Sequence, residues 1–152
     1  MITIKLVLFF IGLSAAAWID RKTFTIPNWL TASMIAVGLF FGFFPDGSFF
    51  AEAGLVRMME SAIIFVLVLL PFLLGRAWLL PGGDGKLFIA ITAFTGISFA
   101  VYAILAGLIV AVLEAVFIGW KRKMTIKELR QLQIPLAPSI LMGVFFSMVF
   151  LK

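Results

Sequence analysis

The sequence predicts an all-α polytopic membrane protein that forms a single domain over residues 1–152 and has six transmembrane helices. Hydrophobic residues make up 64% of the chain and charged residues 12%, whereas soluble proteins contain about 25% charged residues. The apolar residues gather in six runs, most of them about as long as a helix needs to cross a bilayer. A soluble fold of this size could not bury so much apolar surface. We therefore expect a lipid bilayer as the surrounding medium.

The first apolar run, residues 2–19, is long enough to span a bilayer. Its early cation Lys5, its apolar stretch and the small residues 15–17 also fit a secretory signal peptide, which would be cleaved. Trp18, placed before a charged turn, is typical of an anchor at the membrane interface. Because five further runs follow, we expect an uncleaved first helix.

A polar segment, residues 20–28, separates the first run from the second. Pro27 closes this segment and has no N–H to donate, and Asn28 is of a residue type that caps helices. We therefore expect a helix to begin at Trp29 and to continue to about residue 44, where the turn residues Pro-Asp-Gly-Ser follow.

The third run, residues 56–74, carries two opposite charges near its start. Arg57 and Glu60 are three positions apart, which places them on one side of a helix, and we expect them to pair at the membrane edge. A glycine-rich loop, residues 75–86, follows this run and leads into the fourth.

The fourth and fifth runs are nearly continuous over residues 87–120, about 34 residues where one crossing needs roughly 20. Two shorter helices with a tight turn at residues 95–98, which include a glycine, fit this length better than one long helix. Glu114 lies inside the fifth run. It either pairs with a basic loop residue or lines a cavity.

A strongly basic loop, residues 121–133, precedes the last run. In this loop Thr125 and Glu128 have the spacing of a capping box, in which the Thr caps a short helix and the Glu reaches back to the Thr backbone. The last run, residues 134–151, contains two prolines near its start. We therefore expect its first turn to be irregular.

The cations indicate how the six crossings are oriented. The loops of one side carry nine cations and those of the other side three, and the positive-inside rule places the richer side in the cytoplasm. Both chain termini are then extracytoplasmic. The nine are Arg21, Lys22, Arg76, Lys86, Lys121, Arg122, Lys123, Lys127 and Arg130, and the three are Lys5, Arg57 and Lys152.

The residue types that the chain lacks narrow the possible chemistry. It has no cysteine and no histidine, which excludes thiol nucleophiles, disulfides, the Ser-His-Asp triad and the HExxH zinc motif. We expect neither a metal nor a cofactor. The net charge of +5 does not indicate nucleic-acid binding, because the cations form no stripe with interleaved aromatic residues.

The segment 78–88 concentrates polar residues between two apolar runs. It holds a carboxylate, Asp84, and a cation, Lys86, and a charge in such a place is costly enough to indicate a function. Glycine permits positive φ and lets another backbone come close, so we expect the glycines of this segment to shape the site. They are Gly82, Gly83 and Gly85.

A second carboxylate, Asp20, ends the first run, and the predicted topology brings it to the cytoplasmic face together with Asp84. Two carboxylates that share one proton supply a general base and a general acid, because like charges about 3 Å apart cannot both ionise. The ionised member takes a proton from a water that attacks a carbonyl, and the protonated member polarises the carbonyl oxygen. We expect this pair to hydrolyse a peptide bond, with neither role assigned to a particular aspartate.

The two aspartates and their neighbours resemble the type IV prepilin peptidases, which are membrane aspartic proteases of the GxGD type. The resemblance rests on Asp20 followed by Ile26-Pro27-Asn28, on Gly83-Asp84 followed by Lys86-Leu87, and on Ile134-Pro135-Leu136-Ala137-Pro138 with Gly143. It extends over nearly the whole chain. Two positions depart from the family pattern: Pro81 replaces the first glycine of the motif, and Gly85 stands where an apolar residue is frequent.

This resemblance implies an aspartic endopeptidase of the bacterial inner (cytoplasmic) membrane whose catalytic pair, Asp20 and Asp84, lies at the cytoplasmic face. The substrate would be a prepilin, cleaved between a short basic leader and the apolar segment that becomes the pilin stem. Pro27 and Asn28 match motif positions, as does Lys86, whose charge either favours ionisation of a neighbouring carboxylate or anchors the chain at the interface.

The resemblance also implies which form of the enzyme this is. Larger members of the family carry an N-terminal segment with paired cysteines and methylate the new N-terminus of the pilin. This chain has neither that segment nor any cysteine. We therefore expect the short, peptidase-only form associated with tight-adherence (Flp) pili, without methyltransferase activity.

Two other functions could use the same residues. Intramembrane acids also bind protons or cations in small membrane transporters, although the first three runs and the last three show no internal repeat. An inactive pilus-assembly subunit would fit the departure at Pro81. Prepilin cleavage and ion flux in liposomes distinguish these functions from a peptidase.

Overall fold

The computed structural model describes residues 2–42, 44, 54–74, 82–125, 128, 132 and 134–150. Within these ranges the chain forms six α-helices and no β-strand. The helices are α1 (Ile2–Thr23), α2 (Asn28–Gly42), α3 (Gly54–Leu73), α4 (Gly82–Thr95), α5 (Ile97–Arg122) and α7 (Leu136–Phe150). The all-α prediction is confirmed.

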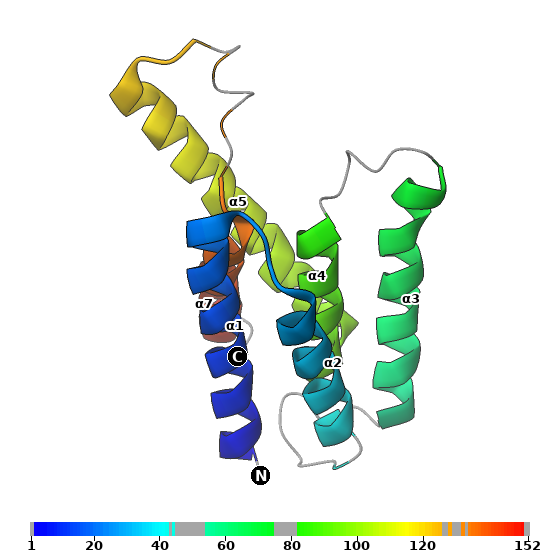
Figure 1. Ribbon diagram of the computed structural model, residues 1–152. Coiled ribbons are helices and arrows are strands. Elements are labelled where there is room, and N and C mark those ends of the chain that lie inside the picture. Colours follow the sequence, from blue (N-terminus) through cyan, green and yellow to red (C-terminus); the bar gives the residue numbers. More distant parts are fainter. Residues whose placement is uncertain are drawn as a thin grey trace.

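Successive helices run in opposite directions (Figure 1). Helix α2 packs on α1 and α4, and α3 packs mainly on α4. Helix α5 crosses this group obliquely, and α7 packs on α5 and α1 (Figure 1). The reversals bring the C-terminal end of α1 and the N-terminal end of α4 to the upper end of the bundle in Figure 1, and the chain after α1 descends to the N-terminal end of α2, which lies lower in that view.

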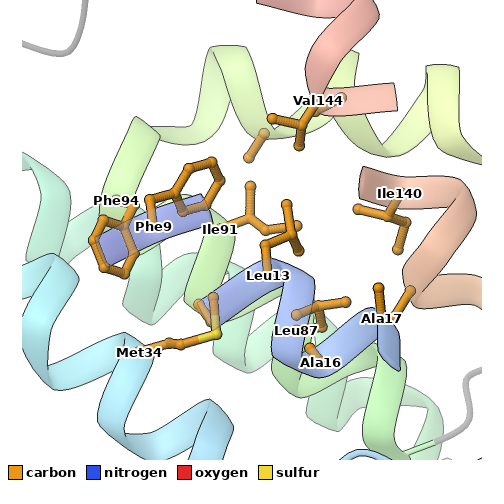
Figure 2. Packing of buried hydrophobic residues seen from close by; sticks show 14 of the residues in the cluster. Phe9, Leu13, Ala16, Ala17, Met34, Leu87, Ile91, Phe94, Ile140 and Val144 are labelled. Atoms are coloured by element: carbon orange, nitrogen blue, oxygen red, sulfur yellow. The ribbon is translucent and has the colours of Figure 1, made fainter. Parts of the chain in front are cut away.

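The hydrophobic core lies where α1 and α4 meet α2 and α7. One face of α1 supplies Phe9, Leu13 and Ala16, which recur at helical spacing. Figure 2 shows them beside Met34 of α2, Leu87, Ile91 and Phe94 of α4, and Ile140 and Val144 of α7. The rings of Phe9 and Phe94 have their centroids 5.1 Å apart, a favourable aromatic separation. This core fixes α1 relative to α4.

Glycines allow three of the helices to approach their neighbours closely. A Cβ at Gly143 of α7 would collide with the backbone of Ala103 and Gly107 on α5. A Cβ at Gly107 would lie 2.7 Å from the Cα of Ile140. On α2, a Cβ at Gly38 would lie 2.9 Å from the backbone of α4. Small residues at helix contacts are characteristic of membrane helix bundles.

The C-terminal end of α1 differs from the predicted end. The helix continues past Asp20 to Thr23. Arg21 and Lys22 lie in its last turn, where cations interact favourably with the helix dipole. Phe24 then adopts the left-handed conformation with φ of 52°, and its N–H donates to the carbonyl of Asp20 at 2.8 Å. Asp20 therefore lies inside the last turn of α1 rather than beyond it.

The predicted turn between the fourth and fifth runs is confirmed. Gly96 separates α4 from α5 with φ of 82°, which glycine adopts without strain. Arg57 of α3 donates to the carbonyl of Phe94, and Glu60 accepts from the N–H of Ile97 at 3.0 Å. Both charged side chains thus fasten the start of α3 to this turn. Arg57 is fully buried, so its role includes the packing of α3, which the sequence did not indicate.

The described part of the basic loop shows one arm of the predicted capping box. Helix α5 ends with Lys123 in the left-handed conformation, with φ of 52°. Glu128 then accepts hydrogen bonds from the backbone N–H and the hydroxyl of Thr125, at 2.7 and 2.9 Å. The bond to the Thr125 N–H is the one that a Glu at the third helical position makes with its cap. Most of the short helix predicted in this loop lies outside the described residues.

The outer faces of α3 and α5 expose large apolar side chains. Helix α5 is the one described helix that is both long and apolar enough to cross a bilayer, while α2 and α7 are apolar but shorter. The exposed apolar residues in the second half of α5 are Val112, Leu113, Val116, Phe117 and Trp120, and those of α3 include Leu55, Met59, Ile63, Val66, Leu67 and Leu70. Contiguous apolar surface of this kind marks contact with a membrane or with another protein.

Candidate active site

Asp20 lies in the last turn of α1 and is 4% exposed. Its Oδ2 accepts a hydrogen bond from the backbone N–H of Ala137 at 3.0 Å. Ala137 belongs to the first turn of α7, where backbone N–H groups have no partner within the helix. The carboxylate of Asp20 therefore joins the end of α1 to the start of α7.

Asp84 lies in the first turn of α4, which begins at Gly82 and not at Leu87 as predicted. The predicted loop is therefore helical from Gly82 onward, and an acidic residue in this turn interacts favourably with the helix dipole. Asp84 precedes the apolar run that starts at Leu87, so it lies at the polar end of the helix. Burial, and in second place the charge of Asp20, raise the pKa of Asp84 to about 6.

Both aspartates line one pocket of about 780 Å³. Its wall comes from the end of α1 and the turn after it, from the first turns of α2 and α4, and from the segment that leads into α7. The lining residues are Asp20, Thr23, Phe24, Thr25, Ile26, Asn28, Gly83, Asp84, Lys86, Ile134, Pro135 and Leu136. Two carboxylates that are 64 positions apart in the sequence thus meet at one end of the bundle.

A hydrogen bond joins the two halves of the sequence motif. Lys86 donates from Nζ to Oδ1 of Asn28 at 2.6 Å. Helix α2 begins at Asn28, one residue earlier than predicted. The carbonyl of Pro27 accepts from the N–H groups of Leu30 and Thr31, so Pro27 takes the capping position that we expected for Asn28. The Asn28 side chain instead links α2 to α4.

We expected the motif glycines to shape the site either through positive φ or through close approach of another backbone. None of the three has positive φ. All three lie in the first turn of α4, and Gly96 is the one glycine with positive φ among the described residues. Close approach is confirmed for Gly83, where a Cβ would lie 3.5 Å from the backbone nitrogen of Ile26, an ordinary contact. Gly85 is buried. Pro81 lies outside the residues that the structure describes.

Sequence reasoning missed the part of α7 in this site. Residues 134–136 line the pocket, and Ala137 binds Asp20. The available signal was the Pro-x-x-Pro pattern at this position, which was noted for its resemblance to a family and not for contact with Asp20. The hydroxyls of Thr23 and Thr25, also missed, lie at the rim and bond each other at 3.1 Å.

The chemistry that this pocket offers is acid–base chemistry. The pocket brings two carboxylates and one amine together, and no three Asp or Glu side chains in the described ranges lie close enough to hold a metal ion. Glu114 is exposed on α5 and is not among the lining residues. A carboxyl with a raised pKa beside a second carboxylate is the arrangement from which an acid and a base are made.

A comparison with known protein families identifies the family of this chain. The sequence profile of the type IV leader peptidase family matches residues 7–119, about three quarters of the chain, and this range includes Asp20 and Asp84. No curated protein and no solved structure shows significant similarity. The resemblance inferred from the motifs is confirmed, and the chain belongs to the type IV leader peptidase family.

Proposed function

We propose that this protein is an aspartic endopeptidase that removes the leader of prepilins at the cytoplasmic face of the membrane, with Asp20 and Asp84 as its catalytic pair. Membership of the leader peptidase family supports a peptidase and a leader-bearing substrate. The observation that carries the choice of residues is the shared pocket, in which Asp20 and Asp84 are the carboxylates among the lining residues.

The different surroundings of the two aspartates support a division of roles. The raised pKa of Asp84 favours this residue as the holder of the shared proton. Asp20, whose Oδ2 receives the N–H of Ala137, is then the base that takes a proton from the attacking water. Asp84 gives its proton to the carbonyl oxygen as the tetrahedral intermediate forms. Asp20 then gives the proton that it took from the water to the amide nitrogen, and Asp84 takes a proton back from a hydroxyl of the intermediate as the C–N bond breaks and the carboxyl product forms.

The other motif residues position this pair. Lys86 reaches from the turn that carries Asp84 to Asn28 at the start of α2. Pro27 fixes where α2 begins, and Gly83 lets the first turn of α4 lie against the segment after α1. Gly82 and Gly85 lie in the same first turn of α4. Loss of any of these contacts would change the separation of the two carboxylates.

We place the chain in the bacterial inner (cytoplasmic) membrane, with six crossings and both termini extracytoplasmic. The exposed apolar faces of α3 and α5 support this environment. Helices α2, α4 and α7 have 14 or 15 residues, so each is about 22 Å long, less than the roughly 30 Å of a hydrocarbon core. A pocket at the ends of such short helices lies close to the depth at which the apolar stem of a prepilin enters the membrane.

As the motif resemblance implies, we further propose the short, peptidase-only form that serves tight-adherence (Flp) pili. In that form the reaction ends with release of the basic leader, and the new N-terminus of the pilin is not methylated. The bilayer and the prepilin are then the partners of this protein, and nucleic acid is not.

The test is cleavage of candidate prepilins by the purified protein in detergent, followed by mass spectrometry. We expect the wild type to release a peptide with the mass of the leader. The variants Asp20→Asn and Asp84→Asn keep the size of each side chain and should lower the rate at least about 1000-fold. Glu114→Gln removes a carboxylate outside the pocket and should cleave at the normal rate.

Two results would contradict the proposal. Processing at the normal rate by either Asp variant would exclude the carboxylate pair. Ion-dependent flux in liposomes, without cleavage of any prepilin, would identify a transporter instead, because a carboxyl with a pKa of about 6 also suits reversible proton binding.

A further inference from the structure

The contact between Asp20 and α7 joins the part of the chain that the family profile matches to a residue beyond that match. The family match ends at residue 119, whereas α7 begins at Leu136. The hydrogen bond from the N–H of Ala137 to Oδ2 of Asp20 therefore joins a residue within the match to one beyond it.

This hydrogen bond is shielded from water at both ends. Asp20 is 4% exposed and Ala137 is 0% exposed. A hydrogen bond to an ionised carboxylate is stronger than one between neutral groups, and the N-terminal end of a helix attracts negative charge. The bond fixes one carboxylate oxygen of Asp20 while the residue still lines the pocket.

Helix α7, which carries this turn, packs closely on α5. Farther along the helix, Gly143 packs against the backbone of Ala103 and Gly107 on α5. Residues 134–136, which precede this turn or begin it, line the pocket. The orientation of the Asp20 carboxylate therefore depends on where α7 sits against α5, and not on α1 alone.

We infer that the first turn of α7 is a positioning element of the active site, in which the backbone N–H of Ala137 holds the carboxylate of Asp20 in its working orientation. The catalytic role that this inference gives to the turn rests on the proposed function. Ala137 acts through Asp20 and does not touch the reacting atoms, so it is a positioning residue.

The test removes this one hydrogen-bond donor and leaves the side chain intact. Incorporation of the α-hydroxy acid of alanine at position 137 replaces the backbone N–H by an oxygen.

The matched control is the same exchange at Met142, an exposed residue of α7 away from the pocket. It removes an ordinary helical donor. For prepilin cleavage we expect the exchange at position 137 to lower kcat about ten- to a hundred-fold, with KM unchanged and the pH–rate profile displaced. The exchange at Met142 should leave all three unchanged.

Thermal unfolding supplies a readout that does not depend on activity. The exchange at position 137 should lower the unfolding temperature of the wild type, and should lower it less in an Asp20→Ala background, because the acceptor is already absent there. Equal kcat for the exchanges at 137 and 142 in a protein that cleaves, or an equal loss of stability with and without Asp20, would overturn the inference. The stability effect of the exchange at position 137 could depend on Asp20 while the wild type cleaves no prepilin. That result would show that the hydrogen bond is present and that the proposed function has failed.

Discussion

Asp84 and Asp20 face one pocket from different surroundings. Asp84 lies in the first turn of α4, where the helix dipole favours its charged form, yet burial outweighs this effect and raises its pKa to about 6. Asp20 receives a backbone N–H from the start of α7. Unequal surroundings of this kind let a carboxylate pair hold one proton between them close to neutral pH.

The raised pKa of Asp84 predicts a pH-dependent stability. The folded protein binds this proton more tightly than the unfolded chain, in which the carboxyl titrates near 3.8. The resulting stabilisation is complete below a pH of about 4 and is lost as the pH rises through about 6. Relative to Asp84→Asn, which does not titrate, we expect the wild type to lose about 2 kcal/mol over this interval. Thermal unfolding of both proteins in detergent measures the difference, and a difference that does not change with pH would contradict a raised pKa.

The sequence could indicate which side chains belong to the site, but not which backbone groups do. Asp20 and Asp84 stand out because charges are rare in so apolar a chain, and Asn28 and Lys86 stand out as polar neighbours in the same two segments. Their meeting in one pocket was predicted from topology. The contribution of Ala137 could not be predicted, because every residue except proline carries the same N–H, and only the arrangement of α7 selects this one.

Among the helices, glycines that look alike in the sequence have unlike surroundings. Gly143 of α7 faces the backbone of α5, which cannot move without displacing that helix. Gly12 of α1 faces the flexible side chain of Met34, whose Cγ would lie 2.9 Å from an added Cβ. A backbone neighbour cannot give way cheaply, whereas a Met side chain can change its rotamer.

This contrast predicts opposite effects for two Gly→Ala substitutions. Both replace a glycine within a helix, so both gain the same roughly 1 kcal/mol in helix propensity. Gly143→Ala should destabilise the protein by about 1–3 kcal/mol, because α5 and α7 must separate. Gly12→Ala should be neutral or slightly stabilising. Unfolding temperatures of the two variants in the same detergent check this, and equal shifts would show that backbone contact does not distinguish the two sites.

The ends of the helices were harder to predict than their existence. Hydropathy detects the apolar run that starts at Leu87, but α4 begins at Gly82 because a first turn of helix can be polar when it lies at a pocket. Similarly, α1 continues through Asp20 to Thr23. In both cases the predicted helix excluded an aspartate, Asp84 or Asp20, that belongs to the helix in the structure.

For the whole molecule, the order of the helices and their alternating directions agree with the prediction (Figure 1). The oblique course of α5 and the position of α3 beside α4 could not be predicted. Soluble helices show which face packs inward by their polar stripe, but these helices are apolar nearly all round, so the pattern does not identify the inner face. Close packing at small residues decides the arrangement instead.

The proposed topology predicts that the two ends of this bundle lie on opposite sides of the membrane. Lys121 is exposed in the last turn of α5, whose C-terminal end projects past the upper end of the bundle in Figure 1, and Phe44 is exposed just after α2, whose C-terminal end lies at the lower end. The chain has no cysteine, so Phe44→Cys and Lys121→Cys each introduce a single thiol.

A membrane-impermeant maleimide should label Phe44→Cys in intact spheroplasts. It should label Lys121→Cys only after permeabilisation. Lys121→Cys leaves eight of the nine cations on its side, enough to keep the orientation. Labelling of Lys121→Cys from outside would reverse the topology and place the aspartate pair away from the cytoplasm.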